Sequence, residues 1–312
     1  MLACRIAVLP HAIDVAPTRG LHRVLGRALA LLALASFGIL LSRILEMNGG
    51  VWGTLWQDMR LTLTVTHFGH VWWWRALAVA WAFWAWSSRR RGAWSTCVLA
   101  IAVAVIALTR SETGHPADHG DFTLAVWIDW LHILAAGTWV GSLFGMTLAV
   151  FPSLLREGKH SIESAAAMFQ RLSTLSGIAL AVLVAGGIFN ATRQLGNFEA
   201  LWTSRYGIIL NVKLALVLVM IAIGAHNRYV KLPRLLACAG KPTPQPLAWR
   251  WLLPERAYVS SLRDAGQILR SCARAVLIES LLGIAVIGAT GALIHAMPPA
   301  DVPPIYTTPA RM

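Results

Sequence analysis

The residues best suited to chemistry gather between positions 113 and 145, in the segment TGHPADHGDFTLAVWIDWLHILAAGTWVGSLFG. His115 and His119 precede an apolar run that Asp129 and His132 interrupt. An ionised side chain near the middle of a bilayer costs at least about 2.5–3.5 kcal/mol, so such groups normally face a protein interior or a wet cavity and have partners there. Because positions three apart share one face of a helix, we expect the carboxylate of Asp129 and the imidazole of His132 to line one site.

Lys213 and Glu279 also interrupt apolar runs. At about 1.5 Å per residue, Lys213 is expected about 10 Å into its run, close to the depths of about 9 Å for Asp129 and about 13 Å for His132. We therefore expect Lys213 to pair with Asp129. Glu279 lies one turn from the opposite end of its run, where Arg274 or a loop cation is the expected partner. Structural ion pairing is the simpler interpretation of both residues.

Histidines are concentrated on the side of the membrane from which these depths are counted. Six of the ten lie there, together with Met47, Met59 and Met297. Imidazole ligates copper, zinc, iron and nickel, whereas thioether selects copper(I), so these side chains predict a transition-metal site without identifying the metal. The candidate ligands are His67, His115, His119, Asp129, His132 and His295.

The composition is that of a membrane protein. Of the 312 residues, 57% are hydrophobic and only 13% are charged, against about 25% charged in an average soluble domain. A helix needs about 20 mostly apolar residues to cross a hydrocarbon core about 30 Å thick. Since only helices and closed barrels satisfy the backbone in lipid, we predict an all-α polytopic membrane protein, a bundle of seven or eight transmembrane helices. The apolar runs are 24–45, 71–86, 93–109, 123–150, 172–192, 206–225 and 275–294.

The net charge of +13 is explained by where the basic residues lie. If the N-terminus is cytoplasmic, 19 of the 27 Lys and Arg residues lie inside, which favours an N-in, C-out chain over a nucleic-acid-binding protein. The predicted organisation is a cytoplasmic N-terminal segment (1–23), a helical transmembrane domain (24–299) and an outer, periplasmic tail (300–312). All four cysteines then lie on the cytoplasmic side, so no disulfide is expected.

Small residues mark where helices can approach closely. Gly137, Gly141 and Gly145 recur at every fourth position and form one smooth face on the predicted fourth helix. A neighbouring backbone can pack against such a face, so we expect this helix in the middle of the bundle.

Two aromatic groups flank the second apolar run. Tryptophans occupy positions 72–74 at one end of this run and positions 84, 86 and 94 near the other. They fit the aromatic belts that lie at the two interfaces of a membrane.

Three long segments resemble the copper resistance D (CopD/PcoD) family of membrane proteins. The densest match is LWTSRYGIILNVKLALVLVMIAIGAHNRYVKLPRL (201–235), which has an intramembrane Lys followed by Ala-x-Asn-Arg and Pro-Arg-Leu. FQRLSTLSGIALAVLVAGGIFNATRQLG (169–196), with Asn190, and RAVLIESLLGIAVIGATGALIHAMPP (274–299), with Glu279, are similar to other family segments. The strongest resemblance therefore lies in the C-terminal half of the chain.

Two further segments extend this resemblance. HILAAGTWVGSL (132–143) is similar to the family's histidine-containing helix, and THFGHVWWWR (66–75) to a Thr-x-x-Gly-x-x-Trp-x-x-Arg element. Together the similar segments cover most of residues 60–299, whereas the first 50 residues match little.

The resemblance implies a bacterial inner-membrane protein that moves copper ions, as its substrate, from the periplasmic side, with uptake as the favoured direction. It also implies a periplasmic CopC-type copper carrier as partner. The outer histidines would collect the ion, and Asp129 with His132 would receive it after partial dehydration. The sequence contains no P-loop, so ATP coupling is not expected and the protein is not predicted to be an enzyme.

Two other functions remain open. A b-type haem protein that transfers electrons also uses histidines inside a helical bundle, but it needs two axial histidines at similar depth, and only His132 is clearly inside a helix. A non-transporting docking subunit for the periplasmic carrier would use its intramembrane charges for structure alone. An absorbance spectrum tests for haem, and copper uptake by a His132→Ala variant tests the docking alternative.

Overall fold

The computed structural model describes residues 2–9, 15–88, 92–114, 117, 120–157, 162–241, 262–296 and 299–301. Nearly all of these residues lie in helices, and no strand occurs in these segments. The prediction of an all-α membrane protein is therefore confirmed at the level of fold class.

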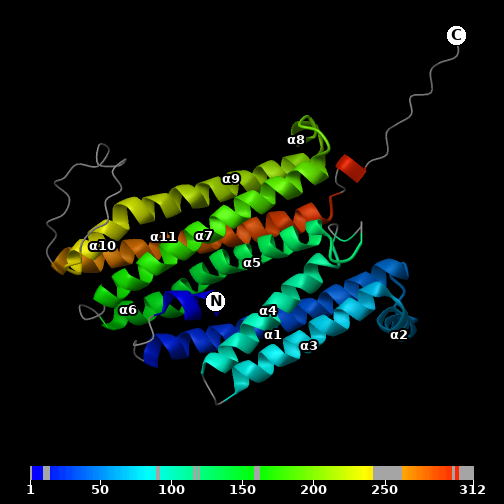
Figure 1. The fold of residues 1–312 in the computed structure, drawn as a ribbon, viewed down its shortest axis with the longest axis horizontal. Coiled ribbons are helices and arrows are strands. Elements are labelled where there is room, and N and C mark those ends of the chain that lie inside the picture. The colour runs from blue at the N-terminus through cyan, green and yellow to red at the C-terminus, as the bar shows by residue number, and fades with distance from the viewer. Residues whose placement is uncertain are drawn as a thin grey trace, which may run out of the picture.

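The N-terminal part contains three long helices that lie side by side (Figure 1). They are α1 (Val15–Met47), α3 (His67–Ser87) and α4 (Ala93–Ser111), accompanied by the short π-helical turn η1 (Cys4–Val8) and by α2 (Leu55–Val65). The α3 helix packs against both α1 and α4. It begins at Thr66, whose hydroxyl accepts a hydrogen bond from the backbone N–H of Gly69 and so caps the first turn.

The C-terminal part contributes four further long helical elements. Two of them are interrupted by π-helical turns: α5 (Leu124–Gly145) continues through η3 (Met146–Val150) into α6 (Phe151–Glu157), and α9 (Arg205–His226) continues through η5 (Asn227–Lys231) into α10 (Leu232–Cys238). The other elements are α7 (Ile162–Leu195), α8 (Ala200–Thr203), α11 (Leu262–Ile294) and the 3-10 turn η8 (Pro299–Asp301). The α5 helix packs against α7, and α11 packs against α9 and α5 (Figure 1).

Six helical elements of the described residues are long and apolar enough to cross a membrane. They are α1, α4, the continuous α5–η3–α6, α7, the continuous α9–η5–α10, and α11. The predicted run 71–86 forms most of α3, which is long enough but rich in tryptophan and contains Arg75, and which is not among the six. The count of seven or eight spans and the N-in, C-out orientation stay predictions.

Two apolar clusters form the core. The larger lies among η1, α5, α7, α10 and α11 and includes the fully buried Met146 and Leu235. The smaller lies among α1, α3 and α4 around Leu29 and Leu99. Large apolar side chains also cover the outside of the bundle, as expected of a surface that faces lipid.

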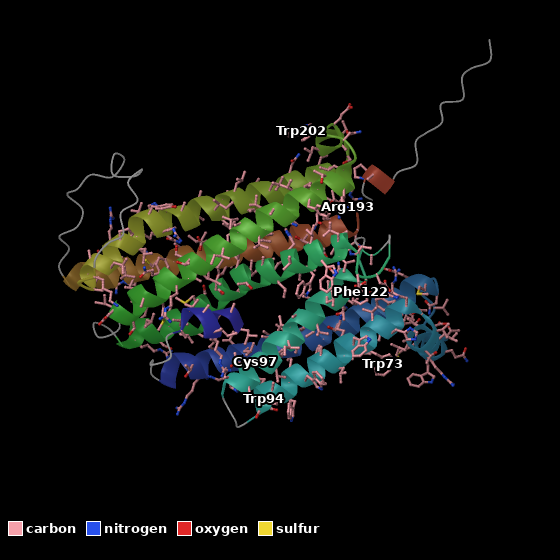
Figure 2. The ribbon with its side chains drawn as sticks, in the orientation of Figure 1. Trp73, Trp94, Cys97, Phe122, Arg193 and Trp202 are labelled. Atoms are coloured by element: carbon pink, nitrogen blue, oxygen red, sulfur yellow. The ribbon has the colours of Figure 1, made fainter. Side chains whose placement is uncertain are left out.

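One end of the bundle is called the outer end below. It carries α2, α8 and the N-terminus of α5, and Figure 2 labels Phe122, Arg193 and Trp202 toward it. The opposite, inner end carries α6 and α10 (Figure 1). Exposed tryptophans occur toward both ends: Trp73 and Trp202 lie toward the outer end, and Trp94 begins α4 toward the inner end (Figure 2).

Candidate functional site

Asp129 lies in the second turn of α5 and is held by hydrogen bonds from two neighbouring helices. The Ser111 hydroxyl at the C-terminus of α4 donates to Oδ2 at 2.5 Å, and the Asn190 amide of α7 donates to Oδ1 at 3.3 Å. An ionised carboxylate only accepts hydrogen bonds, and both of its oxygens have a donor here. Asp129 therefore ties α4, α5 and α7 together in the outer half of the bundle.

His132 follows one turn later on the same face of α5. Its imidazole packs on the backbone of α7, because a Cβ atom added to Gly186 would lie 3.3 Å from Nδ1 and one added to Gly187 would lie 3.6 Å from Cε1. The ring also makes a backbone hydrogen bond with Leu183. Nδ1 is buried and has no hydrogen-bond partner among the described residues. In the neutral ring this nitrogen is therefore an unused acceptor or metal ligand inside the bundle.

Lys213 brings a positive charge from α9 toward the same place. Its ammonium group interacts electrostatically with both Asp129 and His132. No Lys213–Asp129 ion pair within 4.0 Å occurs in the described part of the chain, where the direct partners of the carboxylate are Ser111 and Asn190. We call Ser111, Asp129, His132, Asn190 and Lys213 the outer cluster.

A cavity of about 320 Å³ opens at the outer end of the bundle. It is lined by Arg43, His67, Phe68, Glu112, Thr113, Gly114, Ala117 and Asp121. Within this outer pocket, Nε2 of His67 lies 3.5 Å from Oδ1 of Asp121, and both side chains are about half exposed. An imidazole and a carboxylate at such a separation can bind a proton or a metal ion between them.

Glu112 connects the outer pocket to the outer cluster. It is only 6% exposed and follows Ser111 directly in the chain. Its Oε1 accepts a hydrogen bond of 3.1 Å from the backbone N–H of Phe122, whereas its buried Oε2 has no partner among the described residues. Phe122 has φ of +55°, a conformation that a bulky side chain rarely adopts, so the Glu112 contact helps to hold a strained turn.

Two family models match the chain and together account for most of it. The model described as "Copper resistance protein D-like, N-terminal domain" matches residues 2–122, and the model described as "Copper resistance protein D" matches residues 166–293. The chain belongs to the copper resistance protein D family. Ser111 and Glu112 lie in the first matched region, and Asn190 and Lys213 lie in the second.

Two curated relatives agree with this family. The copper transport protein CutJ of Bacillus subtilis (strain 168) is 28% identical over 212 residues, which are 65% of this chain and 38% of CutJ. The inner membrane protein YebZ of Escherichia coli (strain K12) is 26% identical over 207 residues, which are 62% of this chain and 66% of YebZ. The matches therefore span less than two thirds of either relative. No solved structure matches. The chain is thus a copper-related, multi-pass protein of the bacterial inner membrane.

The predicted metal ligands of this family member are only partly brought together. Asp129 and His132 lie on one face of α5, whereas His67 lies in the outer pocket and His295 is exposed just after the end of α11. His115 and His119 lie outside the described residues. Within the described ranges, no three His, Cys, Asp or Glu side chains lie close enough together to hold one metal ion. An ion bound by the described residues would therefore keep water among its ligands.

The three predicted packing glycines differ in their surroundings. A Cβ atom added to Gly145 would lie 3.0 Å from Cβ of Cys4, so η1 approaches α5 closely at this point. No atom lies within 4 Å of the Cβ position of Gly137, and Gly141 is half-buried. The α11 helix approaches α5 closely at Gly283, whose Cβ position is 3.0 Å from Cγ1 of Val140.

Of the two expected partners of Glu279, Arg274 and a loop cation, Arg274 makes no ion pair with it in the described part of the chain. It is 4% exposed on α11, and Oε1 accepts a hydrogen bond of 3.3 Å from Nδ2 of Asn227. Lys231 of η5 acts on it electrostatically. The partner is therefore a neutral amide from η5 rather than a cation on the same helix.

Four polar residues of the site are found by the structure and not by sequence reasoning: Ser111, Glu112, Asp121 and the buried Arg75. The guanidinium of Arg75 donates to Oγ1 of Thr109 at 3.0 Å and to the backbone oxygen of Thr109 at 2.9 Å, which fixes α3 against α4 below the outer pocket. A Ser-Glu pair directly after an apolar run is a sequence signal that could have indicated Ser111 and Glu112. The partner of each becomes visible only in three dimensions.

Proposed function

We propose that this chain is a transporter, and not an enzyme, that moves copper ions across the bacterial inner membrane from the outer end of the bundle inward. The observation that carries the proposal is the placement of polar groups from the outer pocket toward the interior. Glu112 in the pocket adjoins Ser111, Ser111 donates to Asp129, and Asp129 shares a helix face with His132.

The outer pocket would collect the ion. His67 and Asp121 offer a nitrogen and an oxygen donor, which suit copper(II), and the cavity is wide enough for an ion that retains water. Since both side chains are about half exposed, the ion can exchange with water or with a carrier. In this proposal His115, His119 and His295 extend the collecting surface, although only the last is described.

The outer cluster would receive the ion after partial loss of water. The Asp129 carboxylate supplies negative charge, and Nδ1 of His132 is a buried nitrogen without another partner. Passage requires binding that is strong enough to admit the ion and weak enough to release it. Lys213, whose charge acts on both groups, opposes tight binding and so favours release.

The proposal also includes the orientation of the chain in the membrane and the protein that delivers copper to it. The basic residues favour an N-in, C-out chain, with α3 as a seventh span, and in this orientation the outer pocket would face the periplasm. A periplasmic CopC-type carrier would then deliver copper to the pocket, and transport would be uptake.

A membrane-impermeant thiol reagent checks the orientation of the chain. Phe198→Cys, which is highly exposed, should be labelled in intact cells, whereas Gly92→Cys should be labelled only after permeabilisation.

Copper accumulation in cells tests the function. Cells that express the wild type should accumulate more copper than cells with an empty vector, and His132→Ala and Asp129→Asn should return accumulation to the vector level because the inner ligands are lost. His226→Ala, an exposed histidine at the far end of α9, is the matched control and should behave as wild type. Equal accumulation in all variants would contradict transport and favour a docking subunit.

The haem alternative is supported by one observation, the buried and unpartnered Nδ1 of His132, which could also ligate iron. The absorbance spectrum of the purified protein separates the two functions. A Soret band from stoichiometric haem that is lost in His132→Ala would replace copper transport with electron transfer.

A further inference from the structure

The inner half of the bundle contains a second buried polar group that the proposed copper path does not use. Glu279 and Ser280 of α11 are 4% and 1% exposed, and Asn227 of η5 is 5% exposed. These side chains lie where α11 packs against the elements that carry the two π-helical turns (Figure 1).

The two π-helical turns contact two consecutive residues of α11, and each turn supplies one polar side chain. Asn227, the first residue of η5, donates to Glu279, and Thr147, the second residue of η3, lies 3.0 Å from the hydroxyl of Ser280. Ser280 donates its single hydrogen to the backbone oxygen of Val276, so Thr147 is the donor in this contact. π-helical turns inside α-helices occur frequently at functional sites.

The Thr147–Ser280 contact is complete, whereas the Glu279–Asn227 contact is not. Nδ2 of Asn227 donates to Oε1 of Glu279, but the buried Oδ1 of the same amide has no partner among the described residues. An ionised carboxylate is an acceptor only and cannot satisfy Oδ1. A protonated carboxyl group has one O–H donor, which is the group that Oδ1 lacks.

The surroundings of Glu279 also disfavour a permanent charge. A Cβ atom added to Gly224 would lie 3.4 Å from Oε1, so α9 presents backbone without a polar side chain there, and η3 presents the neutral Thr147 beside the next residue. Among the described residues, Lys231 of η5 is the charged group that acts on the carboxyl, and its Nζ donates to the backbone oxygen of Ser271 at 3.1 Å. An ionised carboxylate with one neutral donor in such a place is costly.

We propose that Glu279 and Asn227 form a proton-binding site in the inner half of the membrane. In the proton-loaded form, the carboxyl O–H donates to Oδ1 of Asn227 while Nδ2 of Asn227 donates to Oε1, which closes a cyclic acid–amide pair. The proton comes from water at the inner end and returns to it, and no other bond forms or breaks. On its release the carboxylate faces an acceptor oxygen, so the pair must separate, and Lys231 is the cation available to it.

The coupling of this site to copper rests on the proposed function. A cation that moves inward brings positive charge toward Glu279, and the loss of the Glu279 proton to water at the inner end offsets part of that charge. Copper movement should therefore respond to the pH difference across the membrane through Glu279.

Infrared spectroscopy of the purified full chain tests the proton site directly. The wild type should show the carbonyl stretch of a protonated carboxyl group at neutral pH, and the Glu279→Gln spectrum should lack this band. Gln at this position supplies an NH₂ to Oδ1 and an oxygen to Nδ2 of Asn227, so both contacts remain and the fold is kept. Glu163→Gln, which removes an exposed carboxyl group, is the control and should leave the band unchanged.

A second variant guards against an indirect effect. Asn227→Leu removes the acceptor and should shift the band to the frequency of a carboxyl group without a hydrogen bond, or abolish it. Identical protonated-carboxyl bands in the wild type, Glu279→Gln and Asn227→Leu would overturn the proposal.

Copper uptake into proteoliposomes separates this proposal from the proposed function. An imposed pH difference should change the uptake rate of the wild type and not that of Glu279→Gln. A wild type that moves no copper but shows the Glu279 band would refute transport and keep the proton site. A wild type that moves copper without any Glu279 band would refute the proton site and keep transport.

Discussion

Each half of the bundle holds a carboxyl group between its helices: Asp129 is half-buried in the outer half, and Glu279 is buried in the inner half. Their surroundings differ. In the outer half, Asp129 has hydrogen-bond donors on both oxygens and a lysine nearby, and a cavity lies one residue from its Ser111 partner. In the inner half, Glu279 has one amide donor, and the acceptor oxygen of that amide lacks a partner. Under the two proposals, the number of hydrogen-bond donors around each carboxyl group, rather than its depth or residue type, suits Asp129 to a metal cation and Glu279 to a proton.

The inner side of the bundle is covered by η1, and the low reactivity of the Cys4 thiol on this turn is the largest effect that we expect. The η1 turn packs against α5 at the inner side of Gly145, and burial raises the pKa of the Cys4 thiol from 9.0 to about 11. A rise of about two units leaves roughly a hundredfold less thiolate at neutral pH, so Cys4 should react at least that much more slowly than a free thiol. Its alkylation should accelerate as the pH rises toward 11.

Mass spectrometry of alkylation in a variant that retains Cys4 as its single cysteine measures this rate. The matched control is Ile6→Cys in a variant without Cys4, since Ile6 lies exposed on the same turn. Equal labelling of the two positions would show that η1 does not close the inner side.

The two amides that hold the carboxyl groups provide the next test. Asn190→Leu removes a donor from Asp129 and should lower copper uptake by roughly 10- to 100-fold, the usual cost of losing a residue that orients a metal ligand. Asn227→Leu removes the partner of Glu279 and should leave copper binding in the outer half intact, while uptake no longer responds to pH. Uptake into proteoliposomes with and without an imposed pH difference measures the rate and its pH response, and calorimetry with copper(II) measures binding by the purified variants. Equal losses of uptake and binding in both variants would contradict the distinction between the halves.

The smallest effect concerns the surface on which His132 packs. Gly186→Ala would place a methyl group 3.3 Å from Nδ1 of His132, so the ring must shift, and this variant should be about 1 kcal/mol less stable than Gly137→Ala. Gly137→Ala gains the same helix propensity where no atom lies within 4 Å and should be neutral or slightly stabilising. Thermal unfolding in detergent compares the two, and a matching loss in Gly137→Ala would contradict the packing described here.

The elements that the sequence predicts well are those governed by apolar periodicity. The runs 93–109 and 206–225 correspond closely to α4 and α9, and the expectation that Asp129 and His132 share a helix face agrees with α5. These features depend on residues close together in the chain, so pattern and helix geometry are sufficient to find them.

The features that the sequence does not predict depend on pairs far apart in the chain. Ser111 reaches Asp129 across the outer loop, and Asn227 meets Glu279 rather than the expected Arg274. The run 172–192 also underestimates α7, which spans Ile162–Leu195, because its polar first turns pack against protein instead of lipid. Tertiary contacts decide all three cases.

Within two of the membrane-crossing elements, a π-helical turn sets the angular position of the helix that follows it. A π turn accommodates one more residue than an α-helical turn, and one residue corresponds to a rotation of about 100° around the axis of a regular helix. Every side chain beyond η3, including the buried Phe151 and Leu154, therefore owes its angular position to that extra residue. Deleting a single amino acid within Met146–Val150 would rotate α6 as a block and turn its apolar face away from the core, although the composition of the span would hardly change.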